Sequence, residues 1–200
     1  MDISEVKQAL LKKGYAVEHF KTKKEATDYL AQSLENRTIG FGGSVTLDEM
    51  GLYEKLSQTN TVLWHWRVSE NETGADIIAK ARNAEIYMTS VNAMSESGEI
   101  VNIDGTGNRV SAMIHGHKKV YFILSTDKIT HDCDSAISRA RNIAAPLNAK
   151  RLNKSTPCAV TGKCYNCKSP DRICRILSVL WEKPTGCDYE VILIDEKSGY

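Results

Sequence analysis

The sequence has no long hydrophobic run, almost no net charge and only 4 prolines in 200 residues. Its strongest apolar run, Val120–Leu124, has the length of a strand and falls far short of the roughly 20 residues that a membrane-spanning helix needs. The first residues show neither the basic nor the apolar region of a secretory signal. We therefore expect a cytoplasmic protein without a membrane partner. Because that compartment is reducing, the 6 cysteines are expected as thiols or metal ligands before disulfides.

The charges balance overall but are unevenly distributed. The chain holds 26 Lys and Arg against 25 Asp and Glu, a net charge of +1, which disfavours a general nucleic-acid or membrane binder. The segment Lys150–Lys183, however, contains eight Lys and Arg and only two Asp and Glu, together with four of the cysteines. No repeat, low-complexity tract or linker divides the chain. These features predict one globular domain with a basic, cysteine-bearing region.

Short apolar runs alternate with helical segments from residue 38 onward. The predicted strands are 38–41, 61–66, 85–90, 99–104 and 119–124. One predicted helix begins at Thr46. Three others span 76–81, 108–115 and 132–145, and the last of these ends near Pro146. This alternation is typical of βαβ units and predicts an α/β fold: a mainly parallel, Rossmann-like sheet with helices on both faces.

Within a single domain over residues 1–200, we expect three parts. Residues 1–37 predict two helices and no strand, and residues 38–149 predict the α/β core. Residues 150–200 predict a cysteine-bearing extension with edge strands, in which the apolar runs 176–181 and 189–194 form a hairpin.

A first glycine-rich turn, Gly40-Phe41-Gly42-Gly43-Ser44, ends one predicted strand and precedes a helix. Ligands of open α/β sheets lie at the carboxyl ends of the strands, where glycines let them approach the backbone. Gly40, Gly42, Gly43 and Ser44 are therefore predicted to bind an anion; the alternative is a purely structural turn with Thr46 as the helix N-cap. The turn matches neither the dinucleotide fingerprint nor a Walker loop, so we expect no nicotinamide or nucleoside triphosphate cofactor.

A second turn, Asn102–Arg109, consists of polar residues and glycine with one exception, although a strand passes into a helix there. Asp104 could transfer a proton and the planar guanidinium of Arg109 could bind a carboxylate or phosphate, so both are predicted catalytic residues. The ligand-binding residues predicted beside them are Asn92, Asn102, Gly105, Gly107 and Asn108. The alternative is a polar network that only supports the two turns.

Together these motifs resemble the lactate-utilisation (LUD) domain family, in particular its stand-alone members. The resemblance rests on Gly40–Ser44, Ser90–Ala93, Gly98–Val110, Arg141–Asn148 and Ser169–Cys174. It implies a fold shared with ribose-5-phosphate isomerase, glucosamine-6-phosphate deaminase and CoA transferases, in which the first glycine turn touches phosphate or CoA. It also implies a bacterial role in converting L-lactate to pyruvate beside iron–sulfur partners, and relatives of this fold often form homo-oligomers.

The preferred hypothesis is therefore binding of a small anionic metabolite: a carboxylate, a sugar phosphate or a CoA-linked acid. The resemblance does not decide whether the chain is an enzyme, because no residue convincingly matches the catalytic glutamate of the CoA transferases. Glu99 comes nearest, and an ordinary glutamate at the start of a strand is the alternative.

Four cysteines form a C-x5-C-x2-C-x6-C pattern. Cys158, Cys164, Cys167 and Cys174 are predicted to hold zinc or a [4Fe–4S] cluster, and the alternatives are redox-active or merely packed thiols. A second hypothesis follows, in which the chain is a non-catalytic subunit that docks on an iron–sulfur partner or passes electrons to it. A third is a metal-stabilised nucleic-acid binder, for which Tyr165 is the one aromatic side chain among the four cysteines.

Overall fold

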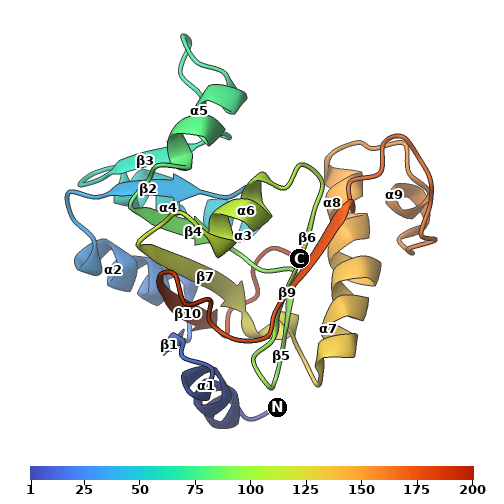
Figure 1. Cartoon of the computed structure of the whole chain (residues 1–200), viewed down its shortest axis with the longest axis horizontal. Helices are drawn as coiled ribbons and strands as arrows, with labels where there is room; N and C mark the ends of the chain where they lie inside the picture. Colours follow the sequence, from blue (N-terminus) through green and yellow to red (C-terminus); the bar gives the residue numbers. More distant parts are fainter.

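Six parallel strands form the main sheet of the protein, seen in a computed structural model that describes residues 1–200 (Figure 1). In sheet order they are β1 (Ala16–Phe20), β10 (Asp188–Ile194), β7 (Lys119–Ser125), β4 (Ile86–Thr89), β2 (Thr38–Phe41) and β3 (Thr61–Trp64). Helices bury both faces of the interior strands, which is why β4, β7 and β10 consist of nearly continuous apolar residues. The predicted mainly parallel α/β sheet is confirmed.

Two hydrophobic cores lie on opposite faces of this sheet. Side chains alternate along β7, so Val120 and Phe122 enter one core while Tyr121 and Ile123 enter the other. The first core is completed by α1 (Ile3–Lys12) and α6 (Asn108–Ile114). The second is completed by α2 (Lys23–Ser33), α3 (Val45–Glu49) and α4 (Leu52–Leu56). A further helix, α5 (Gly74–Ala81), packs on β2 and β3.

A second, smaller sheet packs against the first. Its order is β8 (Ile129–Thr130), β5 (Ala93–Ser95), β6 (Ile100–Asp104) and β9 (Ile176–Leu180). Met94 and Ile100 reach the first core of the main sheet. The opposite face packs on the alanines of a long helical segment made of α7 (Cys133–Arg139), a π-helical turn (Ala140–Ala144) and α8 (Ala145–Arg151).

The expectation of helices alone in residues 1–37 is wrong, because β1 lies between α1 and α2. β1 is an edge strand that pairs only with β10, and Val17 is its only buried side chain. Such a strand has little hydrophobic signal in the sequence. The predicted edge hairpin in residues 150–200 is also wrong, because β9 pairs antiparallel with β6 while β10 lies inside the main sheet between β1 and β7.

Two helix boundaries also differ from expectation. The helix after β2 is capped by Ser44, whose hydroxyl accepts the N–H of Leu47 at 3.2 Å, so the expected cap at Thr46 is wrong by two residues. The helix expected to end near Pro146 continues to Arg151. Pro146 has no N–H to donate to the preceding turn, and the π-helical turn before it absorbs that interruption.

The basic segment after α8 contains one short helix, α9 (Pro157–Thr161), and then no regular element until β9 (Figure 1). It lies beside the far end of α8, away from the main sheet. No helix in the structure combines the length and apolar character that crossing a bilayer requires.

Candidate functional site

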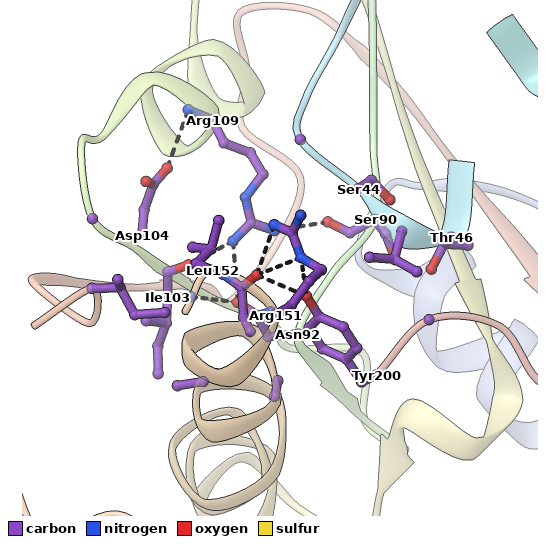
Figure 2. Close-up of a pocket in the computed structure, with 18 of the residues that line it drawn as sticks. Ser44, Thr46, Ser90, Asn92, Ile103, Asp104, Arg109, Arg151, Leu152 and Tyr200 are labelled. Carbon is purple, nitrogen blue, oxygen red and sulfur yellow. Dashed lines mark hydrogen bonds between the residues drawn. The ribbon is translucent and has the colours of Figure 1, made fainter. Parts of the chain in front are cut away.

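A cavity of about 350 Å³ lies where the two glycine-rich turns meet. It is bordered by the residues that follow β2, β3, β4, β6 and β7 and by residues along the length of α8. Figure 2 shows side chains from these segments converging, with Ser44 and Thr46 after β2, Ser90 after β4 and Arg109 on α6. The carboxyl ends of the strands therefore form one site, as the ligand positions of α/β sheets suggest.

Seven of the predicted site residues line this cavity and four do not. The residues that line it are Gly43, Ser44, Asn92, Asp104, Gly105, Asn108 and Arg109. Those outside it are Gly40, Gly42, Asn102 and Gly107. These four residues make structural contacts instead. The geometry does not favour their predicted role in ligand binding, which stays a prediction.

Close packing explains two of the glycines outside the cavity. A Cβ on Gly40 would lie 2.9 Å from the carbonyl oxygen of Ala81. A Cβ on Gly42 would lie 2.8 Å from Thr89 Oγ1 and 2.9 Å from Tyr87 Oη. Gly107, with φ +90°, is the N-cap of α6 in a left-handed conformation that favours glycine. These glycines shape the turns around the cavity.

Arg109 ties the segment that follows β4 to the end of β6 in the cavity wall. Its guanidinium donates to Asn102 Oδ1 at 3.0 Å and to Asn92 Oδ1 at 3.2 Å. It also donates to the carbonyl oxygens of Ser90 and Ile103 (Figure 2). All four acceptors are neutral, and burial lowers the pKa of Arg109. The positive charge therefore has no side-chain carboxylate paired with it, although most of its hydrogen-bonding capacity is used.

Asp104 has both carboxylate oxygens engaged by the backbone. Oδ1 accepts the N–H groups of Thr106 and Gly107, each at 3.1 Å. Oδ2 accepts those of Arg109 at 3.1 Å and Val110 at 3.0 Å. Figure 2 shows this carboxylate pointing toward the start of α6. The geometry gives Asp104 the role of a turn and helix cap, and its predicted proton transfer stays untested.

Lys128, which follows β7, is the buried amine of the cavity wall and was not predicted. Only 1% of the residue is exposed. Its Nζ donates to Thr46 Oγ1 at 2.9 Å and to Ser90 Oγ at 3.2 Å, and it forms no salt bridge. Burial lowers its pKa to about 7. A lysine in this state exchanges a proton near neutral pH.

Charges on three other elements and on the adjacent Asp127 act on Lys128. Arg139 on α7 and Arg109 on α6 lower its pKa further, while Asp127 and Glu49 raise it. Asp127 already accepts a hydrogen bond from the Ser125 hydroxyl and lies 3.7 Å from Arg139 Nη2. The nearest acidic side chain is thus shared with other donors, which leaves the Lys128 amine with hydroxyl partners alone.

The outer wall of the cavity comes from α8 and the last residues of the chain. Arg151 donates to Tyr200 Oη at 2.9 Å and to Asn148 Oδ1, and its guanidinium lies 4.8 Å from the Trp66 ring centroid. Tyr200 donates in turn to Asn148 Oδ1 at 2.7 Å (Figure 2). This cluster holds a third cation, Arg151, at the cavity, and Lys154 lines the cavity nearby.

A family model for the LUD domain matches residues 3–194. The chain belongs to the LUD domain family. No curated protein matches the chain. Among solved structures, this LUD domain is similar to a DUF162 family protein from Deinococcus radiodurans, with 14% identity, a TM-score of 0.56 and coverage of 96% of this chain and 95% of that chain. At this identity the likeness shows the fold alone.

A second solved structure, of eIF2B delta from Chaetomium thermophilum, is 15% identical with a TM-score of 0.37. The match covers 69% of this chain and 58% of the eIF2B delta chain.

The four predicted metal-binding cysteines of this LUD domain are free and half-buried. No three His, Cys, Asp or Glu side chains lie together in a group that could hold a metal ion. Cys164 Sγ accepts the N–H of Asn166 at 3.5 Å and lies 3.9 Å from Arg141 Nη2. As placed, the thiols do not fit zinc or a [4Fe–4S] cluster, and the predicted metal site stays a prediction.

Glu99 does not line the cavity either. Its carboxylate pairs with Lys13 Nζ at 2.8 Å and accepts hydrogen bonds from two serine hydroxyls. It therefore occupies a structural position, at the start of β6.

The cationic residues that the sequence did not point to are Lys128, Arg151 and Lys154. Lys128 had one usable signal: the polar stretch Thr126–Lys128 follows the buried strand β7, as the two glycine turns follow their strands. Arg151 and Lys154 lie in the basic segment Lys150–Lys183, but their place at the cavity depends on α8 continuing past Pro146.

Proposed function

We propose that this LUD domain protein binds a small organic anion in the cavity, either a carboxylate, a sugar phosphate or a CoA-linked acid. One observation carries the proposal: four cationic side chains line the cavity and only one carboxylate does. The cations are Arg109, Lys128, Arg151 and Lys154. The carboxylate belongs to Asp104, which four backbone N–H groups already engage. The cavity therefore has an excess of positive charge that favours an anion.

The form of the cavity supports a small ligand. Its volume of about 350 Å³ lies near the lower end of typical small-molecule sites. Hydroxyl groups of Ser44, Thr46, Ser90 and Tyr200 and the amides of Asn92 and Asn108 line it beside the cations. Such groups can orient the uncharged part of a metabolite through hydrogen bonds.

The family supplies the metabolic context. We propose a role in the conversion of L-lactate to pyruvate, which the resemblance to the LUD domain family implies. A ligand of that pathway carries a carboxylate, which agrees with the charge of the cavity.

Isothermal titration calorimetry tests the proposal with one representative of each anion class. Lactate, pyruvate, ribose 5-phosphate and acetyl-CoA are titrated into the protein at pH 7 and low salt, with lactamide and ribose as neutral counterparts. We expect at least one anion to bind and its neutral counterpart not to bind. Equal binding of anion and counterpart, or binding of none, would overturn the proposal.

Two lysines of the same basic segment offer a matched pair of variants. Lys154 lines the cavity, while Lys168 is exposed and does not. Lys154→Met should weaken binding of the anion and Lys168→Met should leave it unchanged. Equal loss in both variants would point to the basic segment as a whole instead of the cavity.

A further inference from the structure

We propose, on the basis of the anion-binding function above, that the amine of Lys128 forms an imine with a carbonyl compound that carries a carboxylate or a phosphate. The site combines a buried amine and an excess of positive charge in one cavity of about 350 Å³. A ligand that satisfies both features has an anionic group and an electrophilic carbon. A 2-oxo acid and a ketose or aldose phosphate share that chemistry.

The partners of Lys128 leave its nitrogen suited to attack a carbonyl. Thr46 Oγ1 and Ser90 Oγ are its hydrogen-bond partners, and no carboxylate forms a salt bridge that would hold it as an ammonium. Arg139 and Arg109 add positive charge around it. A desolvated lysine near other cations loses its proton near neutral pH, and the free amine that results is the nucleophilic form.

Of the two hydroxyls beside the amine, one can move the protons that imine formation requires. Thr46 Oγ1 lies 3.4 Å from the carbonyl oxygen of Ser198 and donates to it, so Thr46 acts as an acceptor toward Lys128. The other contact of the Ser90 hydroxyl, to the Val91 carbonyl oxygen, is long at 3.5 Å. Ser90 is therefore the hydroxyl free to exchange a proton with Nζ.

The step balances without a cofactor. The Nζ lone pair attacks the carbonyl carbon, a C–N bond forms, and the carbonyl oxygen becomes a hydroxyl by taking a proton from nitrogen through Ser90. The carbinolamine then loses this hydroxyl and the remaining N–H proton as water, which leaves the imine. Nothing is oxidised or reduced. The cationic side chains of Arg151 and Lys154 are available to the anionic group of the ligand, and Arg109 adds positive charge to the cavity wall.

Reductive trapping tests the proposal. The full chain is incubated with pyruvate or with dihydroxyacetone phosphate, treated with sodium borohydride, and analysed by intact mass and peptide mapping. We expect one reduced adduct on Lys128, formed with the carboxylate or the phosphate probe according to which anion the cavity accepts. Lactate, which has the carboxylate but no carbonyl, should compete and reduce the yield.

Two variants make the result specific. Lys128→Met should abolish the adduct, and circular dichroism shows whether it is folded. Lys118→Met removes an exposed lysine outside the cavity and should leave the yield unchanged. Adducts spread over exposed lysines, or an adduct that survives in Lys128→Met, would overturn the imine.

Calorimetry with the same probes separates the imine from anion binding. If a probe binds but no adduct forms on Lys128, the imine is overturned and the proposed function stands. If neither the probes nor any other anion binds, the imine and the proposed function fail together.

Discussion

Lys128 Nζ lies 2.9 Å from Thr46 Oγ1, which joins the segment after β7 to the segment after β2. The two residues are far apart in the sequence and both are almost fully buried. Parallel strands bring their carboxyl ends to one edge of the sheet, so polar residues after different strands meet there. Burying an amine without a carboxylate partner costs stability, which is typical of positions kept for a ligand.

Anion binding should depend on pH through Lys128. Burial lowers the pKa of Lys128 to about 7, so the ammonium that attracts an anion is lost as the pH rises through that value. We expect the affinity to fall between pH 6 and pH 9, by at most about tenfold per pH unit for one proton. Calorimetry in matched buffers checks this. A Lys128→Met variant should show a flat profile, and an equally steep profile in that variant would contradict the assignment to Lys128.

The same lysine should make folding stability depend on pH. The pKa of Lys128 is lower in the folded state than in the unfolded chain, so the unfolded state binds more protons between the two values and stability rises with pH there. The slope from this one group is at most about 1.4 kcal/mol per pH unit. Urea unfolding of the wild type and Lys128→Met at pH 7 to 9.5 measures the difference. At pH 7 Lys128→Met should be at least as stable as the wild type. If the free energy of unfolding changes with pH in the same way in both proteins, the burial of the Lys128 amine is refuted.

Arg109 should contribute to stability as well as to the charge of the cavity. Replacing it by Met removes four hydrogen bonds, to Asn92, Asn102 and two backbone carbonyl oxygens. We expect the free energy of unfolding to fall by about 3 kcal/mol, since hydrogen bonds to charged groups contribute roughly 1.5–3 kcal/mol each and do not add fully. Urea denaturation measures this, with Arg82→Met, which removes an exposed arginine, as the control. If Arg109→Met loses no more unfolding free energy than Arg82→Met, the stabilising role of Arg109 is refuted.

Two glycine substitutions should have opposite effects. Gly42→Ala places a Cβ 2.8 Å from Thr89 Oγ1, and this overpacking should lower stability by about 1–3 kcal/mol. Gly74→Ala meets no atom closer than 3.6 Å at the start of α5 and should leave stability unchanged or raise it by up to about 1 kcal/mol. Thermal unfolding compares the two. Equal melting temperatures would show that the turn after β2 is not tightly packed.

The cysteine segment predicts metal in the purified protein, at roughly one zinc or four irons per chain. Because its thiols form no ligand group as placed, metal would require residues 157–175 to rearrange. Elemental analysis and a visible spectrum of anaerobically purified protein decide the point. Four irons with a brown colour would favour the electron-transfer hypothesis. If the purified protein contains neither zinc nor iron, the predicted metal site is refuted. Redox chemistry of the thiols would then be the hypothesis to test for the segment.

The parallel core was predictable because buried strands such as β7 are continuous apolar runs. β1 was missed because an edge strand with one buried side chain has almost no such signal. The short distance between β9 and β10 in the sequence favours a hairpin. In the structure the two strands belong to different sheets, because β10 pairs with β7 and β9 pairs with β6.

The site was partly predictable for the same reason. Glycine and polar residues after predicted strands indicate where the two turns lie. The sequence does not show that the donors of Arg109 are used within the cavity wall, on Asn102 and Asn92, instead of being free for a ligand. Lys128 depends on burial, which no local pattern encodes.

The central claim, that the cavity binds a small organic anion, is tested most directly by comparing Lys128→Met with Lys118→Met. Each substitution removes one lysine charge by the same change of side chain, inside the cavity and outside it. For the anion that binds tightest to the wild type at pH 6.5, we expect about a tenfold loss of affinity in Lys128→Met, because a lost bond to a charged group costs roughly 1.5 kcal/mol or more. Lys118→Met should match the wild type. Equal affinities in the two variants would contradict the claim.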